Sequence, residues 1–326
     1  MCIRAVLCVL TCTLASANIA LASTQTFPSG PITIVAPYAA GGPTDTLARI
    51  IAEGMARSLG YPVIVENLPG AAGSIGVARV VRAKPDGHTL NIGNWGTNVV
   101  NGAVRKLKYD LLADLEPISL LANNPHMIVS RSSVPAADLA QLIAWVRANP
   151  DKVSSGHSGA GSGSHISGLY FQRETGTRFP FAAYRGAGPI LQSLMAGHID
   201  VFFDQVSNSL PYLSTGKIRA YAVAAKSRVA AAPDIPTTDE AGLPGFHVSI
   251  WHALWAPKGT SRDVIAKLNA AVVQTLSDPA IRKRLGELGQ EIPEREQQTP
   301  EALRAFQKAE IEKWWPIIKA YDIGLD

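Results

Sequence analysis

The chain has 326 residues, of which 47% are hydrophobic and 17% are charged, and its formal net charge is +4. This length suffices for two domains and the apolar fraction for a large core, so an intrinsically disordered protein is excluded. The basic excess is small, and no block of Lys and Arg with interleaved aromatic residues stands out, which argues against a nucleic-acid-binding protein.

The first 22 residues have the composition of an export signal. Arg4 is their only charged side chain, the run from Ala5 to Leu14 is apolar, and Ala20-Leu21-Ala22 has the A-x-A pattern of a signal-peptidase site. The apolar run is too short to span a membrane. We expect cleavage after Ala22 and a periplasmic mature protein. The alternative is an N-terminal anchor that stays attached.

Motifs for metal, cofactor or covalent chemistry are missing from the sequence. The three cysteines, Cys2, Cys8 and Cys12, all lie in the export signal, so the mature chain would have neither a disulfide nor a thiolate. There is no H-x-x-x-H, H-E-x-x-H, G-x-S-x-G, G-x-G-x-x-G or G-K-[ST] pattern. We therefore expect no metal, no cofactor and no catalytic residue.

Residues 31–49 predict a strand, a glycine loop and the start of a helix. The run Ile32–Ala36 is apolar and β-branched, and Gly41 and Gly42 follow it. Thr44 or Asp45 can cap the helix that begins there. Free backbone N–H groups and the helix dipole favour an anion at such a helix start. The alternative is a simple strand-to-helix turn that binds nothing.

Two further strands are expected at 62–66 and 88–93, and both end in loops rich in Gly, Asn and Thr. Strands that alternate with helices indicate a parallel sheet covered by helices on both faces. Ligands bind beyond the carboxyl ends of the strands in such sheets. Asn94, Trp95 and Thr97, which follow the second of these strands, are therefore candidates for ligand contact.

A second glycine-rich loop occupies residues 156–165. Before it we expect short strands at 118–121 and 127–130, an amphipathic helix at 138–149 and a strand that begins at 153. The loop is dense in Gly and Ser and opens a helix, as the first loop does. Glycine allows a ligand to approach the backbone closely. Two such helix starts that face each other across a cleft would clamp one carboxylate.

The remainder of the chain predicts strands at 181–184, 201–204 and 218–224, with short helices between them. Arg185 can pair with a far carboxylate of the ligand or remain a solvated charge. Asp204 can accept from a ligand amine or hydroxyl, or cap a neighbouring loop. A long connection with a possible helix at 239–241 precedes an extended segment, 246–257, that returns to the first sheet. Helices at 262–276, 279–288 and 300–321 finish the chain.

The order and number of these motifs resemble the extracytoplasmic substrate-binding proteins of tripartite tricarboxylate transporters, also called the Bordetella uptake gene family. The resemblance covers essentially the whole mature chain. It rests on residues 34–45, 66–76, 85–90, 159–165, 184–189 and 236–242. Three positions depart from the family pattern: Tyr38 stands where Phe or Trp is common, His88 where Tyr is usual and Arg185 where Lys is frequent. The departure at Tyr38 leaves the ligand's identity open.

The resemblance implies an α/β fold of the two-domain periplasmic-binding-protein type (type II, Venus flytrap), in which each domain has a central sheet flanked by helices. We assign residues 23–122 and 246–326 to the first domain and residues 123–245 to the second. The implied function is that of a non-catalytic, monomeric receptor. It would capture a small organic carboxylate by hinge closure and deliver it to the membrane permease subunits of the transporter. The alternatives are an exported enzyme or a sensory receptor on the same scaffold.

The resemblance also places the ligand between the two glycine-rich loops. His165 in the second loop would bond the ligand or only fix its loop. The predicted ligand-binding residues are Tyr38, Ala40, Gly41, Gly42, Thr44, Asp45, Asn94, Trp95, Thr97, Ser158, Gly159, Ala160, Gly161, Ser162, Gly163, Ser164, His165, Tyr184, Arg185 and Asp204.

Overall fold

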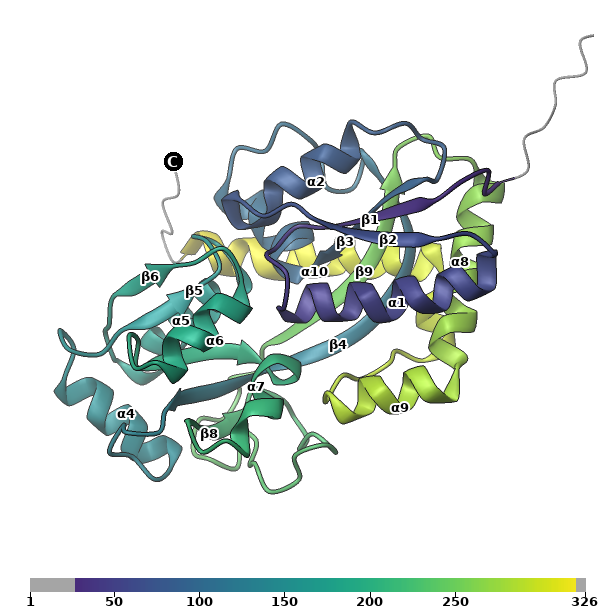
Figure 1. Cartoon of the computed structure of the whole chain (residues 1–326). Coiled ribbons are helices and arrows are strands. Elements are labelled where there is room, and N and C mark those ends of the chain that lie inside the picture. The colour runs from purple at the N-terminus through teal and green to yellow at the C-terminus, as the bar shows by residue number, and fades with distance from the viewer. Residues whose placement is uncertain (1–26, 321–326) are drawn as a thin grey trace, which may run out of the picture.

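The computed structural model describes residues 27–320, and the expected export signal lies outside them. These residues form a mixed sheet whose strand order is β2-β1-β3-β9-β4-β7-β5-β6, with β8 beside β4, and helices flank it (Figure 1). The α/β class predicted from the sequence is confirmed. Within the described residues, no helix is both long enough and apolar enough to span a membrane.

The first lobe is built on β1 (Ile32–Ala36), β2 (Val63–Asn67) and β3 (Thr89–Asn94), which are parallel, and on β9 (Ser249–Pro257), which is antiparallel to β3. Strand β1 lies between two neighbours, so its apolar side chains are buried. Its helices are α1 (Pro43–Leu59), α2 (Ser74–Val81), α3 (Asn101–Val104), α8 (Arg262–Ser277), α9 (Pro279–Glu287) and α10 (Pro300–Ala320), with short turns at Ala71–Gly73, Gly96–Val100 and Arg295–Gln298.

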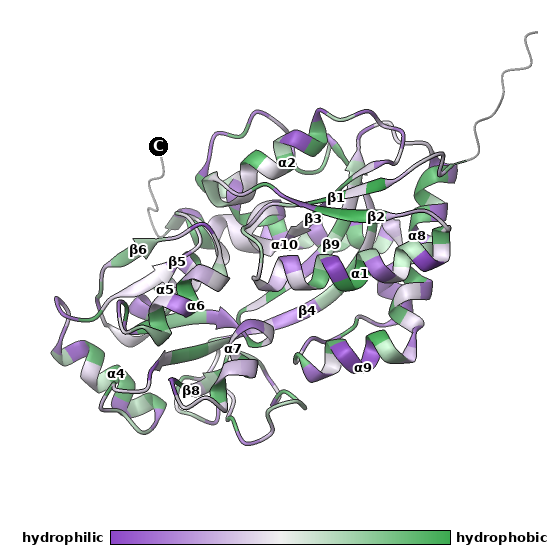
Figure 2. Cartoon of the chain, viewed as in Figure 1, coloured by the Kyte–Doolittle hydropathy of each residue, from purple (hydrophilic) through white to green (hydrophobic). Residues whose placement is uncertain are grey.

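The core of the first lobe joins β1 to helices from both ends of the chain. Ile34 packs in one cluster with Leu47 and Ile51 of α1 and with Leu268 and Val272 of α8. All five are fully buried, as the helical spacing of the apolar residues in α1 predicts. Figure 2 shows hydrophobic segments in β1 and β2, and hydrophilic stretches on α1 and α9. This packing holds the start of α1 at the carboxyl end of β1.

The second lobe contains β5 (Ser155–His157), β6 (Phe181–Ala183), β7 (Val201–Gln205) and β8 (Ile218–Val223). Strand β5 is parallel to β6 and β7, whereas β7 and β8 are antiparallel to β4. The helices of the second lobe are α4 (Leu139–Ala148), α5 (Gly163–Thr175), α6 (Ala187–Met195) and α7 (Val206–Leu213). Residues 239–241, where we expected a short helix, form a turn instead.

One long strand, β4 (Leu115–Arg131), joins the lobes. Its residues 115–125 pair with β9, and its residues 126–131 pair with β7 and β8 (Figure 1). Our expectation of two short strands at 118–121 and 127–130 is wrong. The polar stretch between them stays in the ladder, because Asn123 pairs with Trp251 and the His126 N–H donates to the Val248 carbonyl. The predicted return of residues 246–257 to the first sheet is confirmed by β9.

Candidate functional site

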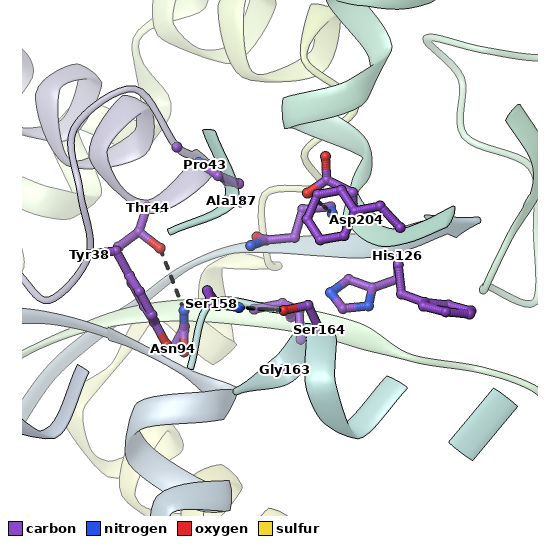
Figure 3. Close-up of a pocket in the computed structure, with 15 residues that line it drawn as sticks. Tyr38, Pro43, Thr44, Asn94, His126, Ser158, Gly163, Ser164, Ala187 and Asp204 are labelled. Atoms are coloured by element: carbon purple, nitrogen blue, oxygen red, sulfur yellow. Dashed lines mark hydrogen bonds between the residues drawn. The ribbon is translucent and has the colours of Figure 1, made fainter. Parts of the chain in front are cut away.

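A small cavity lies between the two lobes. Figure 3 shows Thr44 and Asn94 of the first lobe on one side of it and Ser164, His126 and Asp204 on the other. It lies beyond the carboxyl ends of β1, β3, β5 and β7, where ligands bind in such sheets. Its lining residues are Tyr38, Gly42, Pro43, Thr44, Asn94, His126, Ser158, Gly163, Ser164, Ala187, Phe202, Phe203, Asp204, Gln205 and Ile250.

Four helices begin at this cavity: α7 after Gln205, and three others, which are α1 with Pro43 and Thr44, α5 with Gly163 and Ser164, and α6 with Ala187. None of the three has a side-chain hydrogen bond at its N-cap. The N–H groups of a first helical turn have no partner inside the helix, so they are available to an acceptor in the cavity. Together with the helix dipoles they favour an anion there.

The N-cap of α1 corrects one detail of the sequence analysis. We expected Thr44 or Asp45 to cap this helix, but the N-cap is Gly42 and the helix begins at Pro43. Proline suits the first helical position because its ring fixes φ near the helical value and its missing N–H would have no partner there. Thr44 and Asp45 consequently lie inside the first turn.

The wall from the first lobe is polar but uncharged at neutral pH. Thr44 Oγ1 lies 3.0 Å from His252 Nε2, and Asn94 Nδ2 donates to Thr44 Oγ1 at 3.5 Å. Burial lowers the pKa of His252 to about 3. Burial also raises the pKa of Tyr38 to about 12, although a hydrogen bond with Asn94 opposes this. The wall therefore presents neutral dipoles rather than charges.

The wall from the second lobe is a chain of hydroxyl groups. Ser164 Oγ accepts from the Ser158 N–H at 3.2 Å and lies 3.2 Å from Ser162 Oγ. Farther in, Ser167 Oγ lies 2.8 Å from His126 Nδ1. Burial lowers the pKa of His126 to about 3, so this imidazole is neutral as well.

Asp204 is the one carboxylate in the lining, and its side chain is 1% exposed. It accepts from the Gln205 N–H at 2.9 Å, from Asn208 Nδ2 at 2.7 Å and from Ser209 Oγ at 2.5 Å. Burial raises its pKa to about 7, and these hydrogen bonds oppose the rise. Asp204 therefore lines the cavity and accepts from three groups at the start of α7.

Cations are missing from this lining. None of the described residues that line the cavity is Lys or Arg. Residues 27–320 also contain no group of three or more His, Cys, Asp or Glu side chains that could hold a metal ion. An anion in the cavity would depend on backbone N–H groups and hydroxyls.

Several predicted ligand residues lie behind the lining instead of in it. The Asp45 carboxylate is fully engaged with Arg49, Asn67 and the Gly41 N–H, so it holds the first loop in shape. Trp95 packs edge-on against Trp314, with 4.9 Å between ring centroids. The predicted residues outside the lining are Ala40, Gly41, Asp45, Trp95, Thr97, Gly159, Ala160, Gly161, Ser162, His165, Tyr184 and Arg185.

Thr97 and the flanks of the second loop also make internal contacts. Thr97 Oγ1 accepts from the Asn94 N–H at 2.8 Å. His165 Nδ1 accepts from the Gly161 N–H at 3.0 Å, which is the loop-fixing alternative. The Tyr184 hydroxyl lies 2.6 Å from Ser193 Oγ, and the Arg185 side chain is exposed. These residues shape the loops around the cavity.

Sequence reasoning missed seven lining residues. Pro43 and Ala187 had a usable signal, because each follows a glycine at the start of a helix. Gln205 directly follows the predicted Asp204. The others gave no local signal, since they are apolar residues or, for His126, lie inside a long strand. The seven are Pro43, His126, Ala187, Phe202, Phe203, Gln205 and Ile250.

The lobes touch each other around the cavity. The Ala39 N–H donates to the Arg185 carbonyl at 3.2 Å, and Arg105 Nη2 donates to the Ala160 carbonyl at 2.6 Å. At Gly159, whose φ is +110°, an added Cβ would lie 3.0 Å from the Ala72 nitrogen. Glycine is needed there for both its conformation and its close approach. The structure is thus a closed form.

Comparisons with known proteins agree with this geometry. The sequence pattern of the tripartite tricarboxylate transporter family receptor (TctC) matches residues 47–323. Protein BugT of Bordetella pertussis is 31% identical over 309 residues, which cover 94% of each chain. The chain therefore belongs to this receptor family, as its motifs suggested.

Solved structures of similar proteins have the same fold. MatC from Rhodopseudomonas palustris with bound malate is 41% identical, with a TM-score of 0.86 over 90% of this chain and 100% of that one. Rpa4515 from R. palustris with adipate is 31% identical, with a TM-score of 0.86 over 91% of this chain and 98% of that one. The fold is that of two-domain periplasmic binding proteins.

Proposed function

We propose that this receptor captures a small organic carboxylate in the cavity between its lobes and delivers it to the membrane permease subunits of a tripartite tricarboxylate transporter. Two similar proteins were solved with malate and with adipate, which are both carboxylates. The family is one of solute-binding receptors. The proposed role for this chain is accordingly binding and delivery, without turnover of the ligand.

One observation supports the carboxylate above all: three helices begin at the cavity without side-chain caps, and no Lys or Arg is among the described lining residues. A carboxylate supplies the acceptor atoms that these helix starts lack. Because α1 belongs to the first lobe and α5 and α6 to the second, such a ligand would bridge the lobes. The ligand would favour the closed form through the contacts that it makes only there.

The remaining details belong to the same proposal. We place the hinge in β4 and in the return into β9, with domains at 23–122 plus 246–326 and at 123–245. We also propose that the mature protein is a periplasmic monomer that begins at Ser23, after cleavage behind Ala22. The permease would recognise the closed form.

The test is a thermal-shift screen of the exported protein against small carboxylates and their amides. A ligand at about 100 times its dissociation constant adds about 2.7 kcal/mol to the free energy of unfolding, which raises the melting temperature measurably. We expect at least one acid to stabilise the protein, its amide to have no effect, and the acid to be recovered unchanged. Stabilisation by uncharged solutes alone would refute the carboxylate site, and consumption of the acid would refute the receptor role.

A further inference from the structure

The second glycine-rich loop contacts the first lobe at residues 159–161, which do not line the cavity. Arg105, directly after α3, donates from Nη2 to the Ala160 carbonyl at 2.6 Å. An added Cβ at the neighbouring Gly159 would lie 3.0 Å from the Ala72 nitrogen, so the two backbones touch there. Protein atoms alone make this contact between the lobes, beside the ligand cavity.

Arg105 has few other partners for its charge. Its side chain is partly buried, and its Nε atom has no hydrogen-bond partner within residues 27–320. Burial lowers its pKa, yet an arginine keeps its charge at neutral pH. The groups that act on this charge are the hydroxyls of Tyr38 and Tyr109, which are neutral because burial raises their pKa values. The hydrogen bond to Ala160 is therefore charge-assisted, and such bonds are stronger than neutral ones.

Two imidazoles fix the peptide that carries this carbonyl. His157 Nδ1 accepts from the Gly159 N–H at 3.0 Å, and His165 Nδ1 accepts from the Gly161 N–H at 3.0 Å. The two glycines flank Ala160, and both are left-handed, with φ values of +110° and +79°. The two hydrogen bonds therefore hold the backbone on either side of Ala160 and so orient its carbonyl.

The imidazoles also support each other. Their ring centroids lie 4.6 Å apart, and both rings pack edge-on against Phe181 of β6. Burial lowers the pKa of His157 and lowers that of His165 to about 4, with the neighbouring His157 contributing. Both are neutral at pH 7, so each Nδ1 is an acceptor and each Nε2 carries the proton. This support for the loop is built within the second lobe.

We propose that Arg105 latches the lobes in the closed form through the Ala160 carbonyl, and that His157 and His165 are positioning residues that hold this carbonyl within its reach. The latch lies outside the cavity lining, so it acts on affinity by stabilising the closed form. The apparent affinity of a ligand rises with the population of the form that binds it. This inference rests on the proposed function, since it assumes a ligand held between the lobes.

The first test needs no ligand and uses amide hydrogen exchange of the exported protein, followed by NMR. The Ala39 N–H donates to the Arg185 carbonyl of the other lobe at 3.2 Å, so its exchange reports closure at a second place. Arg105→Met keeps the apolar stem and removes the guanidinium. We expect the Ala39 amide to exchange at least about tenfold faster in this variant, because the lobes separate more often. Unchanged exchange at Ala39 would overturn the latch.

The second test is calorimetric binding of succinate, citrate and benzoate, which represent dicarboxylates, tricarboxylates and aromatic acids. For each probe that binds the wild type, we expect Arg105→Met to bind about tenfold more weakly, since one charge-assisted hydrogen bond of the closed form is lost. His157→Leu and His165→Leu each leave a loop N–H without its acceptor, and each should weaken binding about fivefold. The loss should appear in the dissociation rate, because the latch opposes opening.

A double-mutant cycle shows whether the histidines act through the latch. Where they do, the variant that combines Arg105→Met with His157→Leu binds about as weakly as Arg105→Met alone. A long-range attraction between the guanidinium charge and an anionic probe would not depend on the loop. The two losses would then multiply, which would overturn the positioning role of the histidine.

A conservative exchange and a matched control separate positioning from stability. His157→Asn and His165→Asn supply an amide oxygen that can accept the same N–H, so affinity should return to within about threefold of the wild type. The control is Thr175→Val at the far end of α5, where Thr175 Oγ1 donates to the Phe171 carbonyl at 2.6 Å. It should lower the melting temperature and leave affinity unchanged. The same result for the two Leu variants would overturn their role in binding.

The outcomes separate this inference from the proposed function. Faster exchange of the Ala39 amide in Arg105→Met supports the latch even where none of the three probes binds, a result that would count against the carboxylate function alone. A probe that binds the wild type and Arg105→Met equally well overturns the latch and leaves the receptor function standing. Where a histidine variant does not fold, Arg105→Met and the Asn variants decide the matter.

Discussion

Three helices at the cavity begin differently from four at the periphery, whereas the short helices α2 and α3, which do not line the cavity, also lack a side-chain cap. At the periphery, Asp138 accepts from the Gln141 N–H in α4 and Ser261 from the Val264 N–H in α8. Asp278 accepts from the Ala280 N–H in α9, and Thr299 from the Ala302 N–H in α10. At the cavity, α1, α5 and α6 have no such bond.

Residue type alone does not explain this difference. Ser162 and Ser261 are both N-cap serines, yet Ser261 Oγ caps α8 whereas Ser162 Oγ lies 3.2 Å from Ser164 Oγ. In α4, α8, α9 and α10 the cap residue bonds one or two N–H groups of the first turn, which contributes to stability. The cavity helices leave theirs open, which suits a ligand that supplies the acceptor. Helix α7 stands between the two groups, because it begins at the cavity but the Ser207 N–H in its first turn donates to Asn124 Oδ1.

The largest effect should come from giving a cavity helix its own carboxylate. Ser162→Asp places an acidic cap at the start of α5, where it would occupy the open N–H groups and repel a bound carboxylate. We expect ligand affinity to fall about 100-fold, which corresponds to about 2.7 kcal/mol. Calorimetry with the acid identified in the screen measures this change.

The matched control for that variant is Ser261→Asp in α8. It exchanges one capping residue for another at an exposed helix start, so both affinity and melting temperature should stay close to those of the wild type. Equal affinity losses in the two variants would show that the open helix start has no special role in binding.

Acid should act on the site more than on the periphery. Burial lowers the pKa values of His126 and His252 to about 3, so the unfolded chain takes up protons below its own pKa of about 6.5 while the folded protein does not. Stability is then lost as the pH falls. Between about pH 7 and about pH 5 each histidine should cost roughly 2 kcal/mol of unfolding free energy.

The contribution of His126 is measured as the difference between the wild type and a variant in how the free energy of unfolding depends on pH. Asp204, whose pKa burial raises to about 7, acts with the opposite sign, because the folded protein binds its proton more tightly than the unfolded chain. Urea unfolding of the wild type and of His126→Gln at both pH values isolates the histidine. A variant with the same pH dependence as the wild type would contradict this assignment.

Removal of a peripheral cap should have a smaller effect, confined to stability. Asp278→Ala removes the acceptor for two N–H groups of α9, and Asp138→Ala removes the one for α4. Each should lower the free energy of unfolding by about 1 kcal/mol. Ligand affinity should stay the same. A tenfold loss of affinity in either variant would contradict the prediction that the peripheral caps act on stability alone.

Salt should have the smallest effect. Because no Lys or Arg is among the described lining residues, a bound carboxylate depends on enclosed N–H groups and hydroxyls. We expect affinity to change by less than about threefold between about 50 mM and about 500 mM NaCl, since ions screen a closed site weakly. A steep decline of affinity with salt would contradict this prediction, because it would indicate that a cationic side chain holds the ligand.

The sequence alone determined the local units of this protein. Strand β1, a helix after the two glycines that follow it, and the loop before α5 follow from short patterns: an apolar β-branched run, glycines, and apolar residues at helical spacing. The order of these units also identified the family. Such features are set by neighbours in the chain, so they can be read without knowing the fold.

Only the tertiary structure decided which of these residues face the cavity. Asp45 and Trp95 lie in the predicted loops, but neither side chain lines the cavity. The Asp45 carboxylate accepts from Arg49 and Asn67, and the Trp95 ring packs against Trp314. His126 enters the lining because β4 runs unbroken from one lobe into the other. A cavity between lobes is made of residues far apart in sequence, and its lining depends on how strands pair and lobes close.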